Sequence, residues 1–428
     1  MMKTIKNPTK NEWAKLMQRP AVEKEELFTL VNQIFAEIRK DGDKVVEKYS
    51  HFFDKVDLEK LELSEKQLKQ SVINVSKKLQ DAIKLAKSNI EIFHAAQQER
   101  KQIIETTKGV KCWRERRAIE KVGIYIPGGS APLFSTVLML GIPAKLAGCK
   151  EIVLCTPPDK NGKINPAILL TAKLVGVTKI FAVGGIQAIG AMTFGTASIP
   201  KVDKIFGPGN QYVTAAKQVA QNFGVAIDMP AGPSEVLIIA DESCKPEFVA
   251  ADLLSQAEHG ADSQVILLSD NEKVVAQTLQ EIKKQVKVLP RKDIAEKALK
   301  NSKAIVLKSI DECVEFSNEY APEHLILVVK KYTNYTKAIS NAGSVFLGNY
   351  SCESAGDYAS GTNHTLPTNG YSRNYSGVSL DSFVKIITFQ ELSKEGIKNI
   401  GPAIEIMAEA EQLMAHKNAV TVRLKNVK

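Results

Sequence analysis

Residues 121–155 read KVGIYIPGGSAPLFSTVLMLGIPAKLAGCKEIVLC, and this stretch carries the pattern that decides the fold class. Two short apolar runs, 122–126 and 152–155, flank a longer amphipathic segment. Short runs rich in β-branched residues are typical of buried strands, and the segment between them is long enough for a helix. A strand, a helix and another strand in succession predict a parallel sheet.

The same alternation continues along the chain. Further apolar runs lie at 180–183 and 225–227, and a Pro/Gly-rich loop at 229–234 then interrupts the series. A second series follows it, with runs at 236–240, 265–269, 304–307, 325–329 and 345–347. We therefore expect an α/β protein with two Rossmann-like α/β lobes, each with a parallel-sheet core, and a cleft between the lobes.

Helical segments precede and follow the two series. Apolar residues recur at helical spacing from about residue 15 to 100 and again from 392 to 413, and the stretch 361–377 is rich in Gly, Asn, Ser, Thr and Pro. The C-terminal piece could reach another lobe or another subunit. The expected division is an N-terminal arm at 1–25, a first lobe with a helical lead-in from 26–121 plus 235–378, a second lobe at 122–234 and a C-terminal tail at 379–428.

Composition excludes several classes of protein. The 428 residues are 44% apolar and 25% charged, which is typical of globular domains. The net charge of +9 comes mostly from lysine, and acidic residues interleave the basic cluster at 100–117, so we expect no nucleic-acid partner. No apolar run matches a membrane span or a signal peptide, and the six cysteines form no CxxC pair. We expect a cytoplasmic protein that contacts no membrane and has reduced thiols.

The segment 246–260 is predicted to be one helix, because Pro246 suits a first helical position and Gly260 suits the residue past the end. Gln256 and His259, three residues apart, then share a face in the last turn. Histidine is the commonest metal ligand and glutamine is an unusual one. On these residues alone, a metal or substrate site and a simple solvated helix end both remain open.

Glu323 and His324 follow Pro322 and open an apolar run, which places them at the edge of a strand. Adjacent strand residues point to opposite faces, so the two can serve one site only where the backbone is irregular, as a preceding proline permits. A carboxylate and an imidazole together supply a general base and a group that activates water. A surface glutamate beside a packed histidine is the alternative.

The stretch 356–364 is a loop by composition, yet it carries Asp357 and His364 among small residues. His416 lies near the end of the C-terminal helical segment, five residues after Glu411. Together, Gln256, His259, Asp357 and His416 would form a nitrogen and oxygen site suited to zinc or manganese.

Three glycine-rich stretches each follow, or nearly follow, an apolar run: 125–130, 184–187 and 206–210. The phosphate-binding patterns GxxxxGK[ST] and GxGxxG are absent. Ligands of α/β proteins bind beyond the carboxyl ends of the strands, so these stretches are candidates for the rim of a nucleotide site. Any one of them alone is also compatible with a tight turn.

The chain resembles the histidinol dehydrogenase family from about residue 13 to 423. The resemblance rests on the strings YIPGGSAPLFSTVLML, KIFGPGN, DMPAGPSEVLIIAD, DLLSQAEHGADSQV, APEHL, SVFLG, ESAGDYASGTNHTLPT and AHKNAVTVR, which occur in this order. It implies a zinc-dependent, NAD-linked, four-electron oxidation of L-histidinol through L-histidinaldehyde to L-histidine, the last step of histidine biosynthesis. It also implies a homodimer in which the C-terminal tail crosses to the partner's site.

The same resemblance assigns roles to individual residues. The metal ligands and His324 are also expected to contact the substrate. By motif, the zinc ligands are Gln256, His259, Asp357 and His416; the catalytic pair is Glu323 and His324; the substrate contacts include Ser234, His364 and Glu411; and the NAD contacts are Tyr125, Gln187 and Asn210.

Two other functions fit parts of the pattern. A two-lobed solute-binding protein could chelate an imidazole ligand without chemistry, but the missing signal peptide and the Glu323–His324 pair argue against it. A zinc hydrolase could use the same metal ligands and would differ in not binding NAD. The resemblance favours the dehydrogenase over both.

Overall fold

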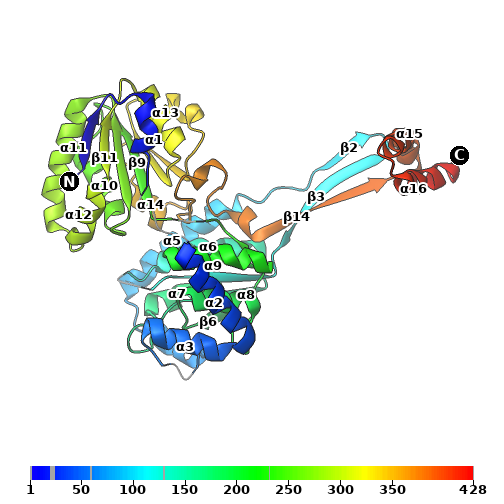
Figure 1. Cartoon of the computed structure of the whole chain (residues 1–428), viewed down its shortest axis with the longest axis horizontal. Helices are drawn as coiled ribbons and strands as arrows, with labels where there is room; N and C mark the ends of the chain where they lie inside the picture. Colours follow the sequence, from blue (N-terminus) through cyan, green and yellow to red (C-terminus); the bar gives the residue numbers. More distant parts are fainter. Residues whose placement is uncertain (1, 20–24, 58–59, 129–130, 231, 428) are drawn as a thin grey trace.

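Three β-sheets organise the molecule, which is described here from a computed structural model. The structure describes residues 2–19, 25–57, 60–128, 131–230 and 232–427. Two parallel sheets form the cores of two lobes, and a third, antiparallel sheet extends from them as an arm that ends in two helices (Figure 1). The expected α/β architecture with two parallel-sheet lobes is confirmed.

The six-stranded sheet has the order β1-β11-β10-β9-β12-β13, and every pairing in it is parallel. Five of its strands match runs predicted from the sequence, and β1 is an addition from the N-terminus. The strands are β1 (Lys3–Lys6), β9 (Glu235–Ala240), β10 (Gln264–Ser269), β11 (Lys303–Val306), β12 (His324–Val328) and β13 (Ser344–Leu347).

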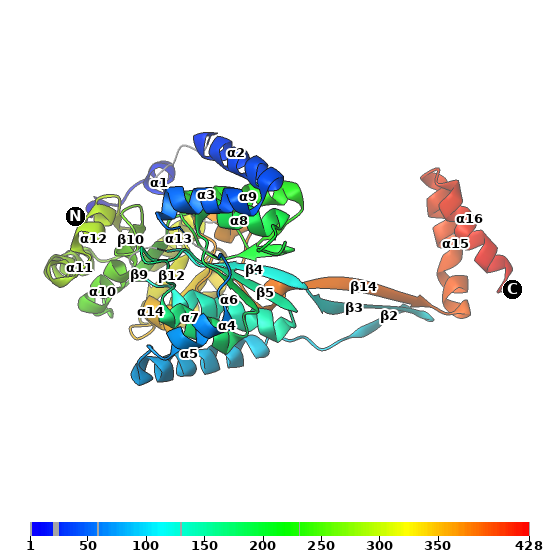
Figure 2. The same ribbon diagram turned by 90° about the horizontal axis from the view of Figure 1, so that it is seen from below.

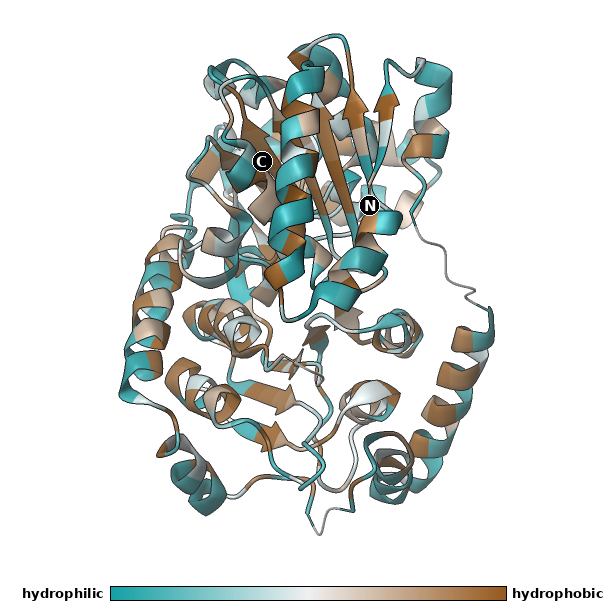
Figure 3. Ribbon diagram, turned by 90° about the vertical axis from the view of Figure 1, so that its left-hand side faces the viewer, coloured by the Kyte–Doolittle hydropathy of each residue, from teal (hydrophilic) through white to brown (hydrophobic). Residues whose placement is uncertain are grey.

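Helices cover both faces of this sheet, which explains why its central strands are apolar without interruption. Alternate residues of β9 face opposite layers: Val236 and Ile238 pack in one core, and Leu237 and Ile239 pack in the other. Figure 3 shows the apolar strands between helices whose outer faces are hydrophilic. The first layer contains α10 (Pro246–Ala257), α11 (Glu272–Gln285) and α12 (Lys292–Lys300); the second contains α1 (Lys10–Leu16) and α13 (Ile310–Tyr320).

The five-stranded sheet has the order β6-β5-β4-β7-β8 and is also parallel. Its strands are β4 (Lys121–Tyr125), β5 (Glu151–Cys155), β6 (Lys179–Phe181), β7 (Lys204–Phe206) and β8 (Ala226–Ile227). The helices that connect them are α6 (Phe134–Ala147), α7 (Pro166–Val175), α8 (Gly185–Phe194) and α9 (Gln211–Ala220).

The N-terminal helices belong to this second lobe, which differs from the expected grouping of 26–121 with 235–378. Val31, Ile34 and Phe35 of α2 lie in the same core as residues of α8 and α9, and Ile83 and Ile90 of α5 lie in the core of α6 and α7. Helical periodicity shows that a helix has an apolar face but does not show which sheet receives it. The helices concerned are α2 (Glu25–Asp41), α3 (Asp43–Asp54), α4 (Glu65–Val72) and α5 (Lys77–Ala95).

The arm is a three-stranded antiparallel sheet that the sequence analysis did not anticipate. Its strands are β2 (Ile103–Thr107), β3 (Val110–Ala118) and β14 (Val384–Leu392), in the order β14-β3-β2. Helices α15 (Lys394–Ala410) and α16 (Met414–Lys425) pack on each other at its far end, away from both lobes (Figures 1 and 2). The predicted C-terminal helical segment therefore lies at the tip of the arm.

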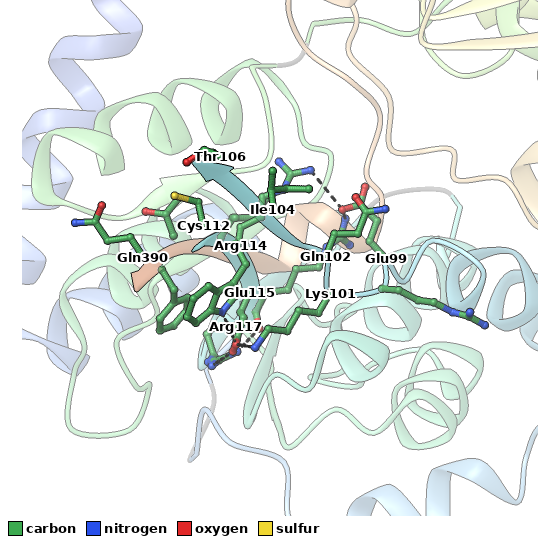
Figure 4. Close-up of a pocket in the computed structure, with 16 residues that line it drawn as sticks. Glu99, Lys101, Gln102, Ile104, Thr106, Cys112, Arg114, Glu115, Arg117 and Gln390 are labelled. Carbon is green, nitrogen blue, oxygen red and sulfur yellow. Dashed lines mark hydrogen bonds and ion pairs between the residues drawn. The ribbon is translucent and has the colours of Figure 1, made fainter. Parts of the chain in front are cut away.

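The basic cluster at 100–117 lies on this arm and is interleaved with carboxylates. Glu115 contacts Lys101 at 2.7 Å and Arg117 at 2.5 Å, and it accepts a hydrogen bond from Trp113 Nε1 (Figure 4). The two cations and this hydrogen bond lower the pKa of Glu115 to about 2. Glu115 thus matches two of the positive charges in the cluster.

Candidate active site

A cleft between the two lobes collects most of the candidate residues. It encloses about 370 Å³, and residues of both lobes line it. The six-stranded lobe contributes residues from the start of β12 and the end of α10, and the five-stranded lobe contributes the loop between β7 and α9. The candidates that line it are Asn210, Ser234, Gln256, His259, Glu323, His324, Asp357 and His364.

Helix α10 positions Gln256 and His259 at one end of the cleft. Pro246 occupies its first turn and the helix ends at Ala257, as the sequence predicts. Gln256 is fully buried, whereas His259 is exposed just beyond the helix, where its backbone N–H donates to the Gln256 carbonyl at 3.2 Å. Both side chains face the same cavity, so the pair is not simply a solvated helix end.

A short helix, α14 (Glu353–Tyr358), brings two carboxylates opposite this pair. Glu353 and Asp357 are one turn apart, and one donor atom from each lies within 4.8 Å of the other and of a ring nitrogen of His259. With its amide nitrogen turned toward Glu353, Gln256 donates to that carboxylate, and its oxygen accepts from Glu235 N at 3.2 Å. The stretch 356–364, expected as a loop, thus begins inside a helix.

Glu323 and His324 both line the cleft because the backbone before β12 is irregular. Ala321 has a φ of 54°, and Pro322 follows it. Glu323 Oε2 lies 3.6 Å from His324 Nδ1, and His324 Nε2 lies 3.7 Å from Asp357 Oδ1. Both side chains are buried, so Glu323 is not a surface residue. His324 lies beside two carboxylates and is therefore not simply packed in an apolar core.

Carboxylates around His324 control its affinity for a proton. Burial lowers the pKa of the imidazole, but the charges of Glu323 and Glu353 and the contact with Asp357 outweigh burial and leave the pKa well above its usual value. Burial raises the pKa of Glu353. Burial also acts on Asp357, but its contact with His324 prevails and lowers its pKa. The cleft therefore gathers three carboxylates, Glu323, Glu353 and Asp357, around His324, and His259 lies beside two of them. Carboxylate and imidazole groups are donors for a divalent cation.

His364 lines the cleft and contacts residues on both sides of it. Its Nδ1 lies 2.8 Å from the carbonyl oxygen of Asp357, and its Nε2 lies 3.0 Å from the hydroxyl of Thr136 in α6. Burial lowers the pKa of His364, so a neutral ring is favoured there. This arrangement holds α14 against the five-stranded lobe.

The described parts of the three glycine-rich stretches, 125–128, 184–187 and 206–210, follow strands β4, β6 and β7 at the carboxyl edge of the five-stranded sheet, and residues 129–130 lie outside the described residues. The predicted cofactor residues in these stretches differ in their access to the cleft. Tyr125 and Gln187 are buried; the Tyr125 hydroxyl accepts from Gly185 N, and Gln187 Nε2 lies 3.4 Å from Asp54 Oδ2. Burial raises the pKa of Asp54 to about 6. Of the three predicted cofactor residues, Asn210 alone lines the cleft, and its side chain also caps helix α9.

Glu411 and His416 do not join the site within one chain. Glu411 follows α15 and His416 lies in α16; both are exposed at the tip of the arm, and neither lines the cleft (Figures 1 and 2). The other members of the predicted metal and substrate set thus meet in the cleft, while these two lie far from it in the same chain.

The fold and the cleft define a two-lobed α/β protein with a polar cleft between two parallel sheets. The same fold occurs in an acetylating aldehyde dehydrogenase from Geobacillus thermoglucosidasius, which is 15% identical with a TM-score of 0.50 over 89% of this chain and 94% of that one. That identity shows a likeness of fold alone.

Closer relatives identify the family. A family model described as histidinol dehydrogenase matches residues 17–424. A histidinol dehydrogenase from Bacteroides thetaiotaomicron is 59% identical over the full length of both chains. The crystal structure of histidinol dehydrogenase from Elizabethkingia anophelis is 65% identical, with a TM-score of 0.98, and covers 100% of this chain and 98% of that one. The chain belongs to the histidinol dehydrogenase family, whose members are NAD-dependent oxidoreductases of histidine biosynthesis.

Two buried carboxylates beside the predicted residues, Glu353 and Glu235, could not be predicted from the sequence. Glu353 stands four residues before Asp357, and that spacing would have been a signal had the segment been recognised as helical. Glu235 precedes an apolar run, and nothing nearby in the sequence indicates that it is buried beside Glu323.

Proposed function

We propose that this protein oxidises L-histidinol through L-histidinaldehyde to L-histidine, with zinc and two molecules of NAD. Family membership supports the reaction, and the observation that carries the mechanism is the meeting of Glu323 and His324 with Gln256, His259 and Asp357 in one interlobe cleft. A base, a water-activating carboxylate and metal donors are the groups that such an oxidation needs. This would be the final step of histidine biosynthesis.

The residues of the cleft fit a zinc ion. Imidazole and carboxylate donors of His259 and Asp357 converge within 4.8 Å, Gln256 lies beside them, and no thiolate is involved. Gln256, His259 and Asp357 would hold the metal, and His416 of a second copy would complete the set. When bound, zinc supplies an anchor for the imidazole and amine of the substrate, together with positive charge.

His324 is the proposed general base in both halves of the reaction. Positive charge at the metal site would offset the surrounding carboxylates and lower the pKa of His324 toward the working range. The neutral imidazole would then accept the hydroxyl proton as hydride leaves the alcohol carbon. Glu323, held beside it, would activate the water that attacks the aldehyde, and His324 would accept a second proton as the hydrate is oxidised.

The remaining predicted residues would bind the two ligands. Ser234 and His364 line the cleft and would contact the substrate, together with Glu411 of a second copy. Tyr125, Gln187 and Asn210 would contact NAD at the carboxyl edge of the five-stranded sheet.

A homodimer in which the tails exchange would bring Glu411 and His416 to the partner's cleft. In support, the arm exposes isoleucines that a monomer would leave in water: the exposed fraction is 54% for Ile103 and Ile104 and 46% for Ile386. The arm also carries α15 and α16 away from both lobes (Figure 2). A crossing tail accounts for both features.

We also propose a cytoplasmic location. Among the residues that the structure describes, no helix is both long and apolar enough to cross a membrane. One relative that is 52% identical, from Arabidopsis thaliana, is described as chloroplastic.

Removal of the metal tests the proposed site. The purified protein is expected to contain one zinc per chain, and treatment with EDTA should abolish histidinol oxidation until zinc is returned. His259→Ala should weaken zinc binding by at least about tenfold, measured by metal analysis and by competition with a chromogenic chelator. His51→Ala is the matched control, because His51 pairs with Asp57 on the surface away from the cleft. Full zinc retention in His259→Ala would contradict the assignment.

A further inference from the structure

Arg19, just beyond α1, forms a buried ion pair with Glu235, which lies next to the proposed catalytic pair. Its guanidinium forms a two-pronged ion pair with Glu235, with Nε 2.5 Å from Oε1 and Nη2 2.9 Å from Oε2. Nη2 also donates to the carbonyl of Tyr320 at 2.8 Å, and the guanidinium lies 3.9 Å from the centre of the Tyr320 ring. The exposed fraction of the side chain is 16% for Arg19 and 2% for Glu235.

Glu235 in turn contacts both members of the proposed catalytic pair through its backbone. Its N–H donates to Glu323 Oε2 at 2.8 Å, and its carbonyl lies 3.1 Å from His324 Nδ1. The sheet explains this proximity, because Val236 of β9 is in register with His324 of β12. One residue therefore sets the position of the carboxylate and the orientation of the imidazole.

The side chain of Glu235 is buried, and an unpaired carboxylate there would destabilise the fold. It is buried near Glu323, and burial and the neighbouring charge both oppose its ionisation. The guanidinium of Arg19 supplies the opposing charge, and Asn369 N–H donates to Glu235 Oε1 at 2.9 Å. Without the guanidinium, Glu235 would be left as an unpaired buried charge or would take up a proton, and its backbone would lose its anchor.

We propose that Arg19 is a positioning residue for Glu323 and His324 and that it acts through Glu235. This inference rests on the catalytic roles proposed above for the pair. Arg19 touches neither the cleft nor the reacting atoms, so it should affect the rate without contributing to ligand binding. Displacement of reacting groups by about 1 Å can cost on the order of 100-fold in rate.

Kinetics of Arg19→Met distinguish positioning from a purely structural role. We expect kcat for histidinol to fall about 10- to 100-fold, with zinc content and the KM for histidinol changed by less than about twofold. Lys10→Met is the matched control: Lys10 also joins this N-terminal segment to the lobe through an ion pair, with Glu315, but on the surface. Its kcat should stay at the wild-type value.

Chemical rescue adds a readout that a change in stability alone would not move. In Arg19→Ala, guanidinium chloride well below denaturing concentrations should restore kcat several-fold, while sodium chloride of the same ionic strength should not. If this variant does not fold, Arg19→Lys and the isosteric Glu235→Gln replace it, and both should lower kcat with zinc retained.

An unchanged kcat in Arg19→Met, or a loss of kcat that only parallels loss of zinc or of folded protein, would overturn the inference. Wild-type turnover of histidinol, measured alongside, separates the two claims. If the wild type does not oxidise histidinol, the proposed function fails. If it does and Arg19→Met matches it, only the positioning role fails.

Discussion

Glu323→Gln is expected to lower the overall oxidation of histidinol to histidine by about 10²- to 10⁴-fold, the range typical of a lost general base. The amide keeps the shape of the side chain, and its oxygen can still accept the hydrogen bond from Glu235 N, so fold and zinc content should not change. The loss should fall on the second half-reaction, where water is activated. The measurement is the rate of NADH formation from added histidinaldehyde, compared with that from histidinol.

His324→Asn provides the contrast, because His324 is proposed to accept the proton in both halves of the reaction. This variant should be slow with histidinol and with the aldehyde, whereas Glu323→Gln should retain the first hydride transfer in a single turnover. If Glu323→Gln oxidised added aldehyde as fast as the wild type, the water-activating role of Glu323 would be wrong.

Mixing two inactive variants should restore activity if the tail crosses between subunits. His259→Ala damages the cleft and His416→Ala damages the tail, and each homodimer should be inactive. In a mixed dimer, one cleft is intact and receives the intact tail of the partner. With random exchange of subunits, about half of the dimers are mixed and each has one working site, so about one quarter of wild-type activity should return.

The geometry of the arm is the reason for this expectation. His416 lies in α16 at the tip of the arm and is exposed, so it cannot reach the cleft of its own chain without a large rearrangement (Figure 1). The measurement is steady-state activity after co-refolding or co-expression, with His416→Ala mixed with itself as the control. No recovery would show that His416 acts within its own chain or not at all.

The parallel sheets could be predicted from the sequence because their strands are buried on both faces. The runs at 236–240 and 265–268 are continuously apolar for this reason and lie in β9 and β10. The arm lacked such a signal, since β3 is at least partly exposed at every residue after Val110 and reads VKCWRERRA, a pattern dominated by charge. The placement of α2 and α5 on the five-stranded sheet could not be predicted either, because an amphipathic pattern does not show which sheet the helix packs against.

Within the site, local sequence patterns indicated functional residues where polar side chains stand together at the end of a predicted helix or strand. Gln256 and His259 at a helix end, and Glu323 beside His324 before a strand, are examples of such patterns. Arg19 and Glu235 gave no such signal, because they are 216 positions apart and meet only through the folded sheet. Long-range ion pairs of this kind leave no periodicity in the sequence.

The number of NADH formed per histidinol consumed distinguishes a four-electron oxidation from a two-electron one. Purified protein with zinc, excess NAD and a limiting amount of L-histidinol would be followed by absorbance of NADH, with histidine quantified at the end point. Each hydride transfer reduces one NAD, so a four-electron oxidation predicts two NADH and one histidine per histidinol. One NADH with release of aldehyde, or none from folded zinc-loaded protein, would contradict the account.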